Sequence, residues 1–300
     1  MSESKRGTYV APTIKAVQLE SSVALKIVKE SEGSFPNPTA GPLLGTDVHG
    51  ELLKISHSYK FPIVYHDQSP LRNRTNLRYQ EELLTSLKET QVSAQLLGWY
   101  QTSQSGKFIT DAVIETLAYA QLKTSPNTVL IIHDPSKASY GILNLKAFRL
   151  SKAFLETYIE NKFTVENLNK NELTYNNIFE ELPVSIHNNH LISLYLSQSG
   201  DSNKFDTSSS LESSSIKNKI TLNNIENLLE SVDELQNFYY QLNRKKQQQQ
   251  QQQPSSSNSN IPSDANLFEL LPLSQKINYT AEDIEQTVLS QFLVDSAIRP

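Results

Sequence analysis

Gly98-Trp99-Tyr100-Gln101-Thr102-Ser103-Gln104 is the stretch that decides the fold. It ends a strand-like segment that starts at Gln95, and it precedes a segment whose apolar residues recur at spacings of four, four and three. Those spacings give a helix one apolar side. A continuous apolar run follows, which is typical of a buried central strand. We therefore expect a helix between two strands here. The helix is marked by Ile109, Val113, Leu117 and Ala120, and the second strand by Thr128 to His133.

The preceding part of the chain alternates in the same way. Thr13 to Leu19, Leu43 to Gly45 and Leu52 to Ser58 have the composition of strands bounded by turn residues. Thr75 to Glu89 has the pattern of a surface helix, since its leucines gather on one side. Strands that alternate with helices in this order predict the α/β class, with a mixed sheet flanked by helices.

The composition excludes several classes of protein. The 300 residues hold 27 Lys and Arg against 32 Asp and Glu, a net charge of −5, and no cysteine. Disulfide frameworks, thiolate metal sites and thiol nucleophiles are therefore absent. We expect a cytoplasmic protein without a membrane segment, because no apolar run approaches the length of a spanning helix. The acidic balance argues against autonomous binding of nucleic acid.

Changes in composition divide the chain into five parts. We expect a folded domain over residues 1–196 and a Ser-rich linker over 197–215, where apolar residues are scarce. An amphipathic helix for bundle assembly follows over 216–246. A Gln/Ser/Asn linker occupies 247–262, and a C-terminal helical segment occupies 263–300. The last three parts form an extended helical arm.

The arm carries two apolar stripes that predict partner binding. In the first, apolar residues recur every seven positions in two interleaved series, as in the seam of a short coiled coil. In the second, we expect Thr280 to be the N-cap of a helix. Asp283, at the third helical position, would complete a capping box with it. Docking on the chain's own domain is the alternative, and we favour a foreign partner because an isolated helix with such a stripe is marginal in water. The predicted partner-binding residues are Ile225, Leu228, Val232, Leu235, Tyr239, Leu242, Ile284, Val288, Leu289, Phe292 and Leu293.

The opening stretch resembles the MPN domain family. Active members of that family carry Gly-Trp-Tyr followed by H-x-H, seven residues and S-x-x-D, with a Glu from an earlier strand. The two His and the Asp bind zinc, and the Glu positions the attacking water. Three further segments are similar to the family, and the resemblance extends from Thr13 to Leu196. They are the turn Gly41 to Gly45, Phe61-Pro62 and His133-Asp134-Pro135.

Carried over position by position, the resemblance implies no metal site. The two His positions hold Gln101 and Ser103, and the Asp position holds Ile114. The Ser position holds Asp111, which we expect to interact with free N–H groups at a helix start. The Glu position holds Pro38. A carboxamide, a hydroxyl and an alkyl group do not replace two imidazoles and a carboxylate around Zn²⁺. We therefore expect no catalytic residue, no metal and no cofactor.

Among silent MPN members, the chain most resembles the family of h-type subunits of eukaryotic translation initiation factor three. This resemblance rests on Gly98 to Gln101, Phe179 to Val184 and Asn188 to Ile192, and on a Gln tract between two helical segments. It implies a non-catalytic scaffold that supports binding to the small ribosomal subunit, mRNA recruitment and scanning. The implied partners are a second MPN subunit and helical-bundle subunits. The alternatives are a silent scaffold of the proteasome lid or signalosome, or a zinc-dependent deubiquitinating isopeptidase.

Three further groups have weaker chemical meaning. His187 and His190 would share the face of a helix, as in some metal sites, but no carboxylate adjoins them. His66-Asp67 contains two members of a hydrolase triad, although adjacency says nothing about geometry. Arg72, Arg74 and Arg78 allow at most a weak RNA contact, and a solvated charged face is the favoured interpretation.

Overall fold

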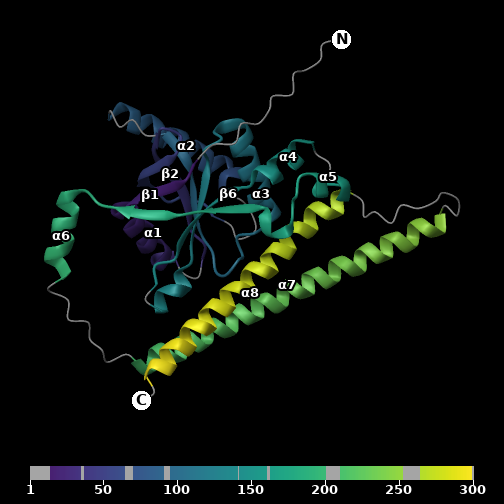
Figure 1. The fold of residues 1–300 in the computed structure, drawn as a ribbon. Coiled ribbons are helices and arrows are strands. Elements are labelled where there is room, and N and C mark those ends of the chain that lie inside the picture. The colour runs from purple at the N-terminus through teal and green to yellow at the C-terminus, as the bar shows by residue number, and fades with distance from the viewer. Residues whose placement is uncertain are drawn as a thin grey trace, which may run out of the picture.

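An eight-stranded sheet forms the centre of the computed structural model (Figure 1). The structure describes residues 14–34, 37–64, 70–90, 95–140, 142–160, 163–200, 210–252 and 264–298. In spatial order the strands are β7 (Phe179–Leu182), β6 (Leu145–Leu150), β5 (Val129–His133), β4 (Gln95–Thr102), β2 (Ala40–Val48), β3 (Leu52–Ser58), β1 (Ala16–Glu20) and β8 (Val184–His187).

The sheet is mixed, as the sequence predicts. β4 and β5 are parallel, β1 is parallel to both β3 and β8, and the other neighbours are antiparallel. The two outermost strands are consecutive in the chain, because only Pro183 separates β7 from β8. The carbonyl of Pro183 accepts a hydrogen bond from Val17 N–H at 2.9 Å. One extended segment therefore joins both edges, which requires the sheet to curl.

Helices cover both faces of the sheet. The helices before the arm are α1 (Ser21–Ser34), α2 (Arg74–Glu89), α3 (Asp111–Tyr119), α4 (Lys152–Glu160), α5 (Val165–Lys170) and α6 (His190–Gly200). Of these, α6 lies beyond the end of β8 and covers neither face (Figure 1). Short turns of helix are η1 (Pro70–Arg72), η2 (Ala120–Thr124), η3 (Pro135–Tyr140) and η4 (Tyr175–Asn177).

The buried strand β5 divides the core into two clusters. Val129 and Ile131 pack with apolar residues of α1 on one face. Leu130 and Ile132 pack with α3 and α4 on the other. All four side chains are buried, as expected for a strand covered on both faces. The α/β class, the mixed sheet and the helical flanks expected from the sequence are confirmed.

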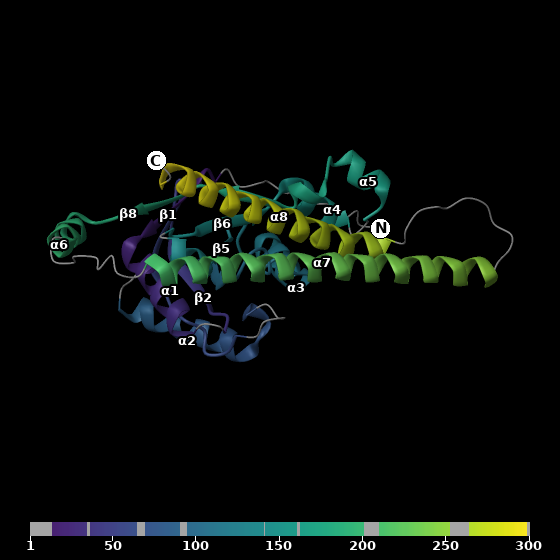
Figure 2. The ribbon, with the colours of Figure 1, turned by 90° about the horizontal axis from the view of Figure 1, so that it is seen from below.

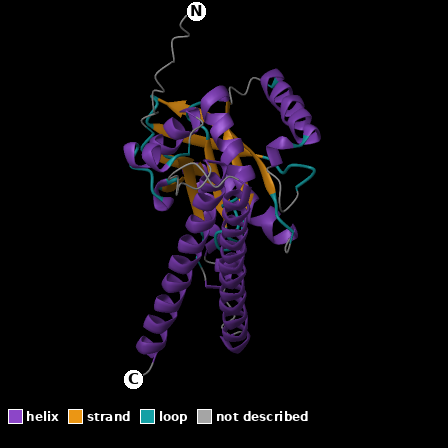
Figure 3. Ribbon diagram, turned by 90° about the vertical axis from the view of Figure 1, so that its right-hand side faces the viewer, coloured by secondary structure: helices purple, strands orange, loops and turns teal. Residues whose placement is uncertain are grey.

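Two long helices, α7 (Ser210–Gln252) and α8 (Asp264–Ile298), form the arm. They run antiparallel and lie side by side in both views of Figures 1 and 2, and α7 extends past the start of α8. Seen from the side in Figure 3, they continue well beyond the sheet. No helix in the described ranges combines the length and apolarity needed to cross a bilayer.

The helix boundaries of the arm differ from the sequence expectation. α7 includes positions 210–215, which we expected in the Ser-rich linker, and Gln247 to Gln252, which we expected in the second linker. Once a helix is nucleated, each added residue gains a hydrogen bond, and glutamine has a high helix propensity. The first four positions of the expected Ser-rich linker, 197–200, belong to α6.

The predicted start of the last helix is wrong. Thr280 lies inside α8, which begins at Asp264 and contains Pro272. Its hydroxyl donates to the carbonyls of Lys276 and Ile277, both at 2.9 Å. Thr280 is therefore bonded to the preceding turn of the same helix and is not an N-cap.

Candidate functional site

Two of the positions that correspond to the MPN zinc ligands, Gln101 and Ser103, lie where β4 ends. Gln101 pairs with Ala40 of β2 and with Ile132 of β5. Thr39 N–H donates to Thr102 Oγ1 at 2.7 Å, and Ser103 N–H donates to the carbonyl of His133 at 3.0 Å. The fold thus places Gln101 and Ser103 close to the strand that follows Pro38, as the resemblance implies.

The residues at these positions do not fit a zinc ion. Ile114 is fully buried in the core cluster on the α3 face. Gln101 is 6% exposed, and no donor in the described part of the chain reaches its Oε1. Among the described residues, no cluster of three or more His, Cys, Asp or Glu could hold a metal. Neutral amide, hydroxyl and alkyl groups lack the donor strength that zinc requires.

The Asp111 carboxyl is partly buried and lies near other negative charges. Thr110, and not Asp111, caps α3, because its side chain accepts from Val113 N–H at 3.4 Å. Burial, together with the smaller effects of the negative charges of Glu269 and Glu115, raises the pKa of the Asp111 carboxyl from 3.8 to about 6. The like charge of Glu269 comes from α8, so the arm acts on this position.

We expect Asp111→Asn to stabilise the protein at pH 7. The folded protein binds this proton more tightly than the unfolded chain, so the free energy of unfolding falls as pH rises from about 4 to about 6. After allowance for solvent screening, the gain at pH 7 should be about 1 kcal/mol. Urea unfolding at pH 7 and pH 4 measures it.

The gain should be much smaller at pH 4, where Asp111 is protonated in the folded protein and partly protonated in the unfolded chain. Glu226→Gln, on the exposed side of α7, is the matched control and should change stability little at either pH. Equal stability of Asp111→Asn and the parent at pH 7 would contradict the raised pKa of this carboxyl.

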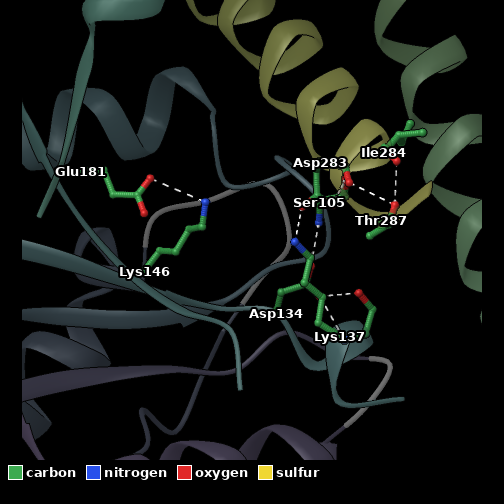
Figure 4. A network of polar contacts seen from close by, with 9 residues as sticks. Ser105, Asp134, Lys137, Lys146, Glu181, Asp283, Ile284 and Thr287 are labelled. Atoms are coloured by element: carbon green, nitrogen blue, oxygen red, sulfur yellow. Dashed lines mark hydrogen bonds and ion pairs between the residues drawn. The ribbon is translucent and has the colours of Figure 1, made fainter. Parts of the chain in front are cut away.

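A polar network joins α8 to the domain, as Figure 4 shows. Asp283 forms an ion pair with Lys137 of η3 and accepts a hydrogen bond from Ser105 Oγ at 3.2 Å. Asp134 accepts from Ser136 N–H at 2.9 Å and from Ser105 N–H at 3.5 Å. Burial is the main cause that raises the pKa of Asp134. Sequence reasoning missed this network, because no local pattern relates Asp283 to residues near position 137.

An aromatic cluster lies next to this network. Phe108 stacks on Phe148 with ring centroids 5.0 Å apart, and Tyr279 of α8 meets Phe108 edge-on at 5.5 Å. Leu271 of α8 is buried in the same core cluster. For the stretch of α8 from Phe268 to Asp283, the structure therefore matches the alternative that we disfavoured, docking on the chain's own domain.

The predicted partner-binding residues of α7 fall into two groups. Leu242 is buried, and Leu228 and Leu235 are half-buried. Ile225 and Tyr239 are 39% and 51% exposed, and Val232 is intermediate. The packing of α7 against α8 thus leaves one column of the predicted seam more accessible than the other.

On α8 the accessible residues lie beyond the docked stretch. Val288 and Leu289 are exposed, and Ile284 is half-buried. The side chains of Phe292 and Leu293 lie outside the described residues. Three exposed residues of α7, Leu222, Leu229 and Tyr240, were not identified by the seam pattern, and they line up with Ile225 of that pattern. Spacings of three, four and eleven residues place this outer stripe on one side of the helix: Leu222, Ile225, Leu229 and Tyr240.

The weaker candidates do not assemble into sites. His187 ends β8 and His190 begins α6, so they do not share a helical face. His66-Asp67 and the side chain of Arg72 lie outside the described residues. Arg74 is exposed, and Arg78 lies 3.6 Å from Glu82 in an exposed pair. A weak contact of these arginines with RNA therefore remains a prediction.

Two family models match successive parts of the chain. Residues 12–125 match the JAB1/Mov34/MPN/PAD-1 ubiquitin protease family, and residues 138–258 match the C-terminal region of eIF3h. The eukaryotic translation initiation factor 3 H subunit of Aspergillus oryzae is 37% identical over 240 residues, which cover 73% of this chain and 66% of that protein. The chain belongs to the family of eukaryotic translation initiation factor 3 H subunits.

Further H subunits are similar over a smaller share of the chain. The H subunits of Coccidioides immitis and Neurospora crassa are each 41% identical, over 198 and 197 residues. Both alignments cover 62% of this chain and 54% of the relative, so the chain spans about half the length of these proteins. The resemblance inferred from Gly98 to Gln101 and the later segments is confirmed.

Proposed function

We propose that this chain is a non-catalytic scaffold subunit of eukaryotic translation initiation factor 3. In that role it supports binding of the complex to the small ribosomal subunit, mRNA recruitment and scanning in the cytoplasm. The observation that carries the proposal is family membership joined to exposed apolar residues on a helical arm. Large apolar patches on a water-exposed surface commonly mark protein contacts.

The donor chemistry of the MPN positions supports the non-catalytic part of the proposal. Gln101, Ser103 and Ile114 supply no imidazole and no carboxylate. Asp111 is a single carboxylate, and no group of three or more His, Cys, Asp or Glu among the described residues could hold a metal ion with it. We therefore assign the domain a role in protein contacts.

Two surfaces support partner binding. The first is the outer stripe of α7, which fits a helix of another protein in a bundle. The second is an apolar groove of about 490 Å³ between α2, α3 and β4, which we propose takes apolar side chains of a second MPN subunit. Leu77 and Tyr119 in its lining are 41% and 58% exposed, and no acceptor among the described residues reaches the indole N–H of Trp99.

Substitution of the outer stripe should detach the chain from its complex. In Leu229→Asp/Tyr240→Asp, two exposed apolar side chains become charged, and each charge would be desolvated at an interface. We expect recovery of initiation factor subunits with a tagged full-length chain to fall roughly tenfold or more. Quantitative mass spectrometry of the co-purified proteins measures this.

The matched control is Leu191→Asp on α6, where the parent side chain is 77% exposed but lies away from the arm. It should leave the recovery unchanged. Recovery of proteasome lid or signalosome subunits alone would overturn the named complex. Stoichiometric zinc together with chelator-sensitive cleavage of a ubiquitin isopeptide would replace the scaffold by an enzyme.

A further inference from the structure

The middle of α8 lies directly on the loop between the MPN positions Ser103 and Asp111. Gly106 in this loop has a φ of +74°, and a Cβ there would stand 2.8 Å from Thr280 Cγ2 and 3.2 Å from Tyr279 Cδ1. Phe108 meets Tyr279 edge-on. The helix and the loop are therefore in close contact, without space for an added methyl group.

The same contact contains a buried ion pair. Asp283 is 6% exposed and Lys137 is 9% exposed, and the two side chains pair directly. Ser105 Oγ donates to the other oxygen of Asp283 at 3.2 Å. Removing one partner of a buried pair is strongly destabilising, because it leaves the other charge desolvated and unpaired. The pair therefore favours one placement of α8 over any in which the helix has moved.

We propose that α8 is a built-in cover over the segment that corresponds to the MPN metal site, and that the Lys137–Asp283 pair is the latch that holds it. In the free chain the cover is closed. The latch fixes the direction in which the arm leaves the domain. This inference concerns the uncomplexed chain and does not depend on which complex the arm joins.

The chemistry around the latch explains why charge decides the closed placement. Asp134 is a second carboxylate in the network, and its pKa is raised by burial and also by the negative charge of Asp283. Tyr279 faces Lys146, whose Nζ lies 5.3 Å from the ring centroid and 3.5 Å from Glu181 Oε2. Asp283→Lys would place a second cation beside Lys137, whereas the double exchange Lys137→Asp/Asp283→Lys keeps one of each sign.

Disulfide cross-linking of the full chain tests the latch, since the chain has no cysteine of its own. Asn278 Nδ2 of α8 donates to Asn176 Oδ1 of η4 at 3.0 Å, and both residues are accessible. In Asn176→Cys/Asn278→Cys, oxidation should form the disulfide rapidly. Adding Asp283→Lys should slow its formation roughly tenfold or more, and the double exchange should restore most of the rate.

The control is Glu234→Gln. It removes an ion pair between Glu234 of α7 and Lys276 of α8, whose Oε2 and Nζ atoms lie 3.2 Å apart, and it should leave the cross-linking rate unchanged. Fluorescence of Trp99, the single tryptophan, reports independently that the domain is folded. An unchanged rate in a folded Asp283→Lys chain would overturn the latch. Slow cross-linking in the parent pair variant would overturn the closed cover, whatever complex the chain joins.

Discussion

Ile114→Asp should unfold the domain or bring it close to unfolding at 25 °C. Ile114 is fully buried on α3 among Trp99, Phe108 and Leu130. A carboxylate there would be desolvated without a cationic partner, which costs several kcal/mol, while the whole stability of a domain is about 5–15 kcal/mol. Urea unfolding followed by Trp99 fluorescence measures the loss.

The control for this prediction is Ile114→Val, which removes one methylene and should cost only about 0.5–1.5 kcal/mol. Asp at this position restores the carboxylate of active MPN members, so the experiment also tests whether position 114 can supply a metal ligand. If Ile114→Asp were as stable as Ile114→Val and bound zinc at one equivalent, the position would be a vacant metal site. We expect instead that it is a core position of this chain.

Local patterns were sufficient to predict strands β1 to β5 and helices α2 and α3, but not α1, α4, strands β6 to β8 or the order of the strands. The apolar run of β5 and the spacing of Ile109, Val113, Leu117 and Ala120 each depend on residues close together in the chain, although Ile109 precedes α3 and Ala120 begins η2. All eight of those side chains are buried in the structure. These residues indicate the fold class, because their periodicity predicts which side of each strand or helix is buried.

The contacts of α8 could not be predicted in the same way. Thr280 and Asp283 have the spacing of a capping box, and the same residue types serve inside a helix once a partner from another element is present. Asp283 finds that partner 146 residues earlier in the chain, at Lys137. A single sequence contains no periodic signal for such a pair, so the docking side of α8 and its predicted partner-binding side could not be separated.

Gly98→Ala tests why glycine is required at the start of the Gly98-Trp99-Tyr100 segment of β4. Gly98 has a φ of +152°, and a Cβ there would stand 1.8 Å from the carbonyl oxygen of Val129 on β5. The backbone would be strained and the parallel β4–β5 pairing would have to open, so we expect a loss of about 3 kcal/mol or more. Far-UV circular dichroism during urea unfolding measures it without relying on the neighbouring Trp99.

Gly33→Ala in α1 is the matched control, since a Cβ at Gly33 meets nothing within 4 Å. There the same substitution should stabilise the helix by roughly 0.5–1 kcal/mol. Equal effects at the two glycines would show that close strand approach does not explain Gly98. If they differ as expected, Gly98 is required by the sheet whether or not a metal follows it. That requirement accounts for a chain that keeps Gly-Trp-Tyr of the MPN motif while its ligand positions hold Gln101, Ser103 and Ile114.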